Sequence, residues 1–128
     1  MQVLKNKKIG IIANHTSLDS KNQTIMDIMS NNQIDVIRIF APEHGYLGNY
    51  QAGEKFDNSK DMLSDIEIVS LYGKNKSPKD KHLSDLDILI FDIQDIGVRY
   101  YTYVSTMTLA MEKAAANNVE FIVLDRPN

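Results

Sequence analysis

Short apolar runs alternate with amphipathic stretches along the chain, and this pattern limits the possible folds more than any other feature. Five runs have the length and the Ile and Val content of β-strands: residues 8–14, 35–41, 66–72, 86–94 and 120–125. Two stretches repeat apolar side chains at helical spacing, residues 24–32 and 103–117, and a short helix is expected before the fourth strand. The sequence therefore predicts a Rossmann-like three-layer α/β/α fold with a mostly parallel sheet of about five strands.

Particular residues predict where the first of the two longer helices begins and which side of the second packs against the sheet. Thr24 stands directly before the first helix and has the side chain of a good N-cap. The second helix is expected to pack against the sheet through one side, formed by Val104, Met107, Met111 and Ala114. The run at 86–94 is the most apolar of the five, which suits a strand buried on both faces.

Length and composition exclude several classes of protein. A chain of 128 residues has the usual size of one domain, so we expect a single domain over residues 1–128. No apolar run approaches the roughly 20 residues of a membrane-spanning helix, and no secretory signal precedes the first strand. The formal charge is −3 without a broad basic block, which argues against binding of nucleic acid. The chain has no cysteine, so neither disulfides nor thiolate chemistry is expected.

A polar cluster follows each of the five predicted strands. In chain order the clusters are NHTS, PEHG, YGK, QDIGVRYYT and DRPN. Ligands of open parallel sheets bind outside the carboxyl ends of the strands, so we expect these clusters to meet at one rim. The connection from Pro42 to about Asp65 is longer than the roughly 12 to 15 residues beyond which structureless loops become uncommon in compact domains, and such loops are usually functional or disordered. We therefore expect a site at this rim, with the connection as a loop over it.

The connection carries candidate catalytic groups. Glu43 and His44 follow Pro42, which favours an extended backbone before them, and Gly45 permits a sharp turn after them. Glu43 is interpreted either as a carboxyl acid or base at a strand end, or as a side chain that accepts hydrogen bonds from loop N–H groups. Glu54 is a further carboxyl candidate in the same connection.

The cluster after the fourth strand combines two carboxyl groups with a guanidinium. Asp92 interrupts an apolar strand and Asp95 follows it, and burial of a carboxylate is costly unless it is paired. Arg99 is the nearest partner. The alternatives are a structural ion pair or helix cap, and an Arg99 that binds a substrate carboxylate through two parallel hydrogen bonds. Gln94 and Tyr101 belong to the same cluster as candidate ligand-binding residues; for Tyr101 the alternative is packing in the core.

The cluster after the first strand offers two further candidates for ligand binding. Asn14 and His15 could orient a ligand, or the NHTS segment could simply build a turn. Histidines at 15, 44 and 82 give a metal site only if their loops converge. Dinucleotide, P-loop, zinc-protease and nucleophile-elbow motifs are all missing from the sequence, and no cofactor is expected.

Several motifs together resemble one family. FAPEHGYLG, AGE, SLYGK, FDIQDIGVRYYTYVSTM and VLDRPN, in this order, are similar to the N-terminal domain of the exo-β-N-acetylmuramidases of the NamZ type, once called DUF1343. The resemblance runs from about Lys8 to Asn128. It implies a bacterial glycosidase that releases terminal N-acetylmuramic acid from the non-reducing end of peptidoglycan fragments during cell-wall turnover.

The resemblance also suggests roles for the candidate residues. Glycoside hydrolysis needs a carboxyl group that protonates the leaving oxygen, for which Glu43 is the first choice. His44, Glu54, Asp92 and Asp95 are candidates for the second group, although a 2-acetamido group of the sugar can itself be the nucleophile. The lactyl carboxylate of N-acetylmuramic acid would be a natural partner for Arg99.

Members of the family are longer than this chain and have a second domain, which leads to further expectations. A domain without that partner would expose apolar surface and associate with itself. It could also bind sugar without hydrolysing it, which is the first alternative function. A second alternative is a metal-dependent hydrolase that uses His15, His44 and nearby carboxylates. Family members are often exported, whereas this chain shows no export signal.

Overall fold

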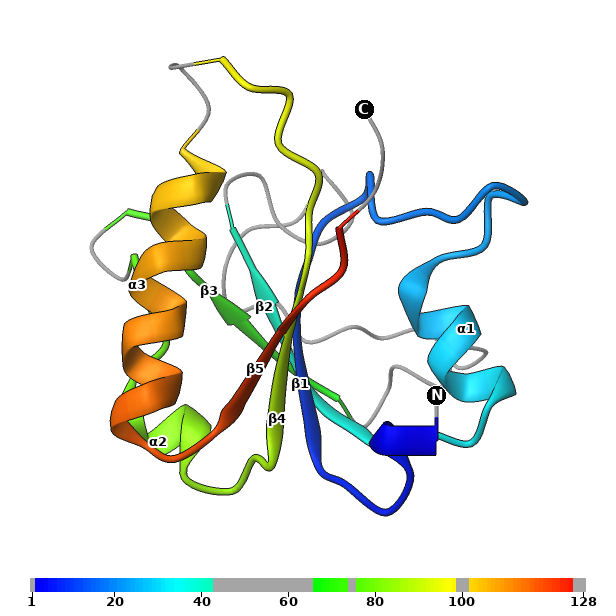
Figure 1. Ribbon diagram of the computed structural model, residues 1–128, viewed down its shortest axis with the longest axis horizontal. Coiled ribbons are helices and arrows are strands. Elements are labelled where there is room, and N and C mark those ends of the chain that lie inside the picture. The colour runs from blue at the N-terminus through cyan, green and yellow to red at the C-terminus, as the bar shows by residue number, and fades with distance from the viewer. Residues whose placement is uncertain (1, 43–65, 74–75, 99–101, 126–128) are drawn as a thin grey trace.

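The computed structural model describes residues 2–42, 66–73, 76–98 and 102–125, and its centre is a five-stranded sheet (Figure 1). The strands are β1 (Ile9–Ala13), β2 (Val36–Ala41), β3 (Glu67–Ser70), β4 (Ile88–Asp92) and β5 (Glu120–Val123). The helices are α1 (Ile25–Asn31), α2 (Asp80–Leu83) and α3 (Tyr103–Ala116), and a short 3₁₀ helix, η1 (Gln2–Leu4), precedes β1. All five predicted strands, the short helix and both longer helices are present.

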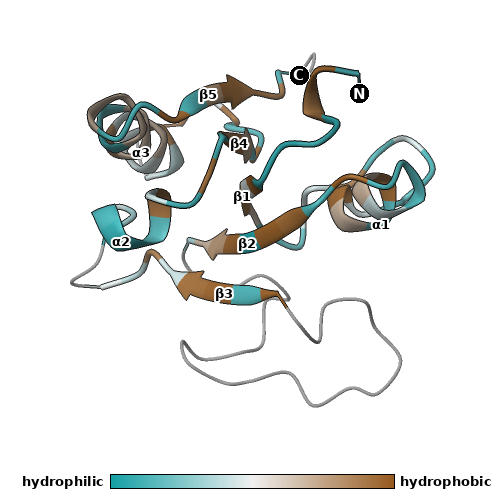
Figure 2. Ribbon diagram, turned by 90° about the horizontal axis from the view of Figure 1, so that it is seen from below, coloured by the Kyte–Doolittle hydropathy of each residue, from teal (hydrophilic) through white to brown (hydrophobic). Residues whose placement is uncertain are grey.

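The strands lie in the order β3-β2-β1-β4-β5, and every neighbouring pair is parallel. Figure 2 shows α1 on one face of the sheet, with α2 and α3 on the other. The predicted three-layer α/β/α fold is thus confirmed. No helix within the described ranges is long and apolar enough to cross a membrane.

Each face of the sheet has its own hydrophobic core. Side chains that alternate along a strand point to opposite faces. Ile11 and Ile90 therefore pack with Met29 of α1 on one face, while Phe91 packs with Ala110 on the α2 and α3 face. Every residue of β1 and β4 is buried, which confirms the prediction for the strand at 86–94 and is typical of central parallel strands.

The prediction for the start of α1 is confirmed, and the prediction for the packed side of α3 is partly wrong. The Thr24 side chain accepts a hydrogen bond from the Asp27 N–H, and the Asp27 carboxylate accepts one from the Thr24 N–H. In α3, Val104 and Met111 are 49% and 42% exposed. The helix instead packs through Met107, Ala110, Ala114 and the first residue, Tyr103. These residues form one stripe at helical spacing in which Ala110 and Ala114 are fully buried, whereas Val104 and Met111 lie beside that stripe.

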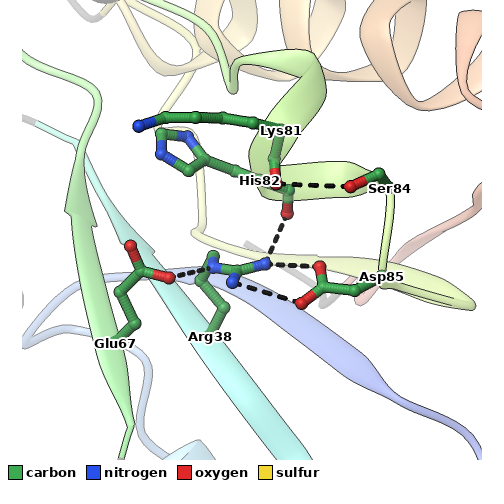
Figure 3. A network of polar contacts seen from close by, with 6 residues as sticks. All are labelled: Arg38, Glu67, Lys81, His82, Ser84 and Asp85. Atoms are coloured by element: carbon green, nitrogen blue, oxygen red, sulfur yellow. Dashed lines mark hydrogen bonds and ion pairs between the residues drawn. The ribbon is translucent and has the colours of Figure 1, made fainter.

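A polar network holds α2 against the sheet (Figure 3). The Arg38 side chain on β2 is only 11% exposed and donates hydrogen bonds to Glu67 on β3 at 2.6 Å and to Asp85 after α2 at 2.7 Å. It also donates to the backbone carbonyl of His82 at 2.7 Å. Hydrogen bonding to Arg38 lowers the pKa of Asp85. The four-residue α2 is thus anchored by charge-assisted hydrogen bonds as well as by the buried side chain of Leu83.

Candidate functional site

The carboxyl ends of β1 and β4 lie side by side where the chain changes direction across the sheet. From β1 the chain moves outward through β2 to β3, and then returns to β4 on the other side of β1. The two strands are in register to their last residues, Ala13 and Asp92. In Figure 1 both continue beyond the same edge of the sheet. Open parallel sheets bind ligands outside such a place, and five candidate residues from the sequence end or closely follow these two strands: Asn14, His15, Asp92, Gln94 and Asp95.

The Asn14 side chain makes hydrogen bonds to other residues of the protein. Its Oδ1 atom accepts hydrogen bonds from the Thr16 N–H at 2.9 Å and from the Thr16 hydroxyl at 2.6 Å. Its Nδ2 atom donates a hydrogen bond at 3.3 Å to the hydroxyl of Tyr103, which is the first residue of α3. Asn14 therefore builds the turn that was one of the two interpretations of the NHTS segment. The neighbouring His15 is exposed on this turn.

Ser17 connects the ends of β1 and β4, a role that the sequence analysis missed. Its hydroxyl accepts a hydrogen bond from the Asn14 N–H at 3.2 Å and donates one to the backbone carbonyl of Asp92. Its own carbonyl accepts a hydrogen bond from the N–H of Ile25, the first residue of α1. Asn14, Ser17 and Asp92 are each 3% exposed, and they are the buried polar residues among those that the structure describes. A serine in a polar turn was the only sequence signal, and it gave no indication of the distant partner.

Asp92 places a carboxyl group under this rim. Alternation along β4 puts its side chain on the same face of the sheet as Ile88 and Ile90, which is the face that α1 covers. Buried carboxyl groups are common in catalytic sites. They are also found in purely structural networks of polar side chains.

Asp95 supplies a second carboxyl group three residues later. Its Oδ1 atom accepts a hydrogen bond from the Gly97 N–H at 2.6 Å. Gly97 has a φ of +73°, a backbone conformation that side chains rarely adopt, so the turn needs glycine. The Oδ2 atom of Asp95 is shielded from solvent and has no hydrogen-bond partner among the described residues. Gln94 lies between the two carboxyl residues and is half-buried.

The other five candidates, Glu43, His44, Glu54, Arg99 and Tyr101, lie outside the described residues. Within the described ranges no group of three or more metal-ligating side chains comes together. Apolar side chains are also exposed around this edge of the sheet: Leu18, Tyr72, Ile96, Val98 and Val104. The rim thus combines carboxyl groups with apolar surface, and sugars present both polar and apolar faces to the proteins that bind them.

Comparisons with known proteins agree on one family. Residues 9–128 match the family described as exo-β-N-acetylmuramidase NamZ, N-terminal. The chain is 44% identical over 126 residues to the peptidoglycan β-N-acetylmuramidase NamZ of Bacillus subtilis strain 168, a match that covers 98% of this chain and 30% of that protein.

Solved structures give the same relationship. A DUF1343 family protein from Bacteroides fragilis is 41% identical with a TM-score of 0.84, over 99% of this chain and 32% of that one. A second DUF1343 protein from the same organism is 38% identical with a TM-score of 0.79, over 100% of this chain and 32% of that one. The chain therefore spans about a third of the length of the relatives it matches.

Proposed function

This chain belongs to the NamZ family of exo-β-N-acetylmuramidases, and from this premise we propose that it is the N-terminal, catalytic domain of a glycoside hydrolase. The proposed reaction releases terminal N-acetylmuramic acid from the non-reducing end of peptidoglycan fragments. The proposed partner is accordingly a muramyl saccharide derived from peptidoglycan. We also propose that residues 1–128 form one domain that folds by itself.

One observation of the site carries the proposal. The buried carboxyl residue Asp92 ends the strand next to β1, at the position where an open parallel sheet binds its ligand. Asp95 adds a second carboxyl group at the same rim. Glycoside hydrolysis relies on carboxyl groups in a site of this kind, so the chemistry of the rim and the membership of the family support the same reaction.

In the proposed mechanism Glu43 is the acid that protonates the leaving oxygen. His44, Glu54, Asp92 or Asp95 then acts on water or on the anomeric carbon. Where the 2-acetamido oxygen of the sugar attacks the anomeric carbon instead, the same group need only orient the acetamide. Of these residues, Asp92 and Asp95 are the two that the structure describes at the rim.

Recognition of the substrate is assigned to other residues. Arg99 would bind the lactyl carboxylate of N-acetylmuramic acid through two parallel hydrogen bonds. His15, Gln94 and Tyr101 are proposed to contact the sugar, as is Asn14, whose amide is shared with the turn.

The experiment that tests the proposal is the substitution Glu43→Gln, measured for hydrolysis and for binding of N-acetylmuramic acid. Loss of a general acid should lower kcat by roughly 10²- to 10⁴-fold and leave binding nearly unchanged. Glu112→Gln is the matched control, because Glu112 is exposed on α3. Hydrolysis by Glu43→Gln at the rate of the control would remove Glu43 from this role.

A second candidate function is binding without hydrolysis. It is favoured by the length of the matched relatives, because this chain covers only 30% and 32% of them and other parts of those proteins could supply essential groups. Binding of N-acetylmuramic acid by the parent chain without any hydrolysis would support this function over the first.

A further inference from the structure

The Ser17 hydroxyl joins the two central strands beyond the last residue pair of their ladder. That ladder ends where Ala13 pairs with Asp92. Beyond it, the Asn14 N–H and the Asp92 carbonyl come from different strands and are both bonded to the same hydroxyl. Ser17 and Asp92 are 75 residues apart in the sequence, so this is a tertiary connection and not a local turn.

The Asn14 amide extends this connection to a third element. Its Nδ2 atom bonds to the Tyr103 hydroxyl at the first turn of α3, 89 residues away. The end of β1, the end of β4 and the start of α3 are therefore linked by the side chains of Asn14 and Ser17, which belong to the same turn. We name the four residues Asn14, Ser17, Asp92 and Tyr103 the clasp.

We propose that Ser17, through the clasp, is a positioning residue that sets the place of Asp92 and the turn after it. This inference rests on the proposed function, because Asp92 and Asp95 are its candidate carboxyl groups. Catalytic and binding groups must be held close to their working geometry by residues that do not touch the substrate themselves. The Ser17 hydroxyl bonds to the backbone carbonyl of Asp92 and not to its carboxyl group.

The test is Ser17→Ala with Ser70→Ala as its matched control. Ser70 is the last residue of β3, and its hydroxyl accepts a hydrogen bond from the Tyr72 N–H, two residues away, at 3.2 Å. Both substitutions remove one hydroxyl at the same edge of the sheet. Among the hydrogen bonds of the described residues, Ser17→Ala breaks a link between strands, whereas Ser70→Ala breaks a local bond.

Two readouts are made on fully folded samples: amide hydrogen exchange along the chain, and binding and hydrolysis of muramyl substrates. Ser17→Ala should speed exchange at residues 93–97 by about tenfold or more over Ser70→Ala, as expected for the loss of a buried hydrogen bond. It should also weaken binding or kcat/KM by about tenfold. Ser17→Thr, which keeps the hydroxyl, should restore both quantities at least in part.

Exchange that accelerates only at residues 14–17, or equally in both alanine variants, would overturn the proposal. If Ser17→Ala does not fold, Tyr103→Phe removes one link of the clasp while keeping the ring, and the same criteria apply to it. If the parent chain neither binds nor hydrolyses the sugar, the proposed function fails for this chain. The exchange at residues 93–97 then still decides whether Ser17 positions that turn.

Discussion

At the scale of single residues, Arg38 shows how one charged side chain fixes a short helix. It bridges Glu67 and Asp85, whose side chains are 53% and 43% exposed, while its own is almost covered. A four-residue helix such as α2 has little stability of its own, so it depends on contacts of this kind. Burial lowers the pKa of the neighbouring His82, whose ring contacts Phe40 edge to face.

Replacing Arg38 with Ala is expected to lower the free energy of unfolding by about 2 kcal/mol, because it removes charge-assisted hydrogen bonds and leaves two carboxylates near each other. Lys113→Ala breaks the exposed Lys113–Asp80 pair and should cost far less, because water screens a pair on the surface. Urea unfolding measures both values. Equal losses in the two variants would show that the Arg38 network adds no more than a surface ion pair.

Local signals in the sequence predicted some of these residues and missed others. Thr24 could be predicted because its partner, Asp27, is three residues away in the same capping box. Ser17 and Arg38 could not be predicted, because their partners lie 29 to 75 residues away and only the fold brings them together. The positions of Asp92 and Asp95 along the chain could be predicted, because Asp92 ends a clearly apolar strand and Asp95 follows it three residues later.

At the scale of elements, the strands were predictable because each apolar run has the length of a buried strand. The packed side of α3 was not, because Val104 and Met111 are as apolar as a core residue while the helix packs through Ala110 and Ala114. Hydrophobicity alone does not distinguish these sides, since close approach to a sheet favours small residues.

Gly10 in β1 packs closely against Leu86, which lies between α2 and β4, and this contact predicts the effect of a larger side chain at position 10. A Cβ atom built on Gly10 would lie 2.6 Å from Cδ1 of Leu86, 3.1 Å from a ring carbon of Phe40 and 3.2 Å from Cδ1 of Leu89. Gly10→Ala should therefore destabilise the fold by about 1 to 2 kcal/mol, measured by chemical unfolding.

A double substitution identifies the cause of that loss. Leu86→Ala removes the atom nearest to the added methyl group, so the combined loss should be smaller than the sum of the two single losses. Strict additivity would mean that crowding against Leu86 is not the reason.

At the scale of the whole molecule, the exposed apolar side chains around the carboxyl edge predict that this chain associates with itself. Tyr72, Ile96, Val98 and Val104 are exposed there, and surfaces of this kind tend to be covered by another chain. Light scattering over a range of concentrations should show a dimer or a larger species. A monomer at every concentration would contradict the prediction.

The measurement that tests the central claim most directly is hydrolysis of a chromogenic β-N-acetylmuramide beside the matching β-N-acetylglucosaminide, which lacks the lactyl group. We expect release of the chromophore from the muramide alone, because the proposed site hydrolyses N-acetylmuramic acid and recognises its lactyl carboxylate. Release from both sugars at the same rate would contradict recognition of the lactyl group. Release from neither would contradict a complete hydrolytic site in this chain.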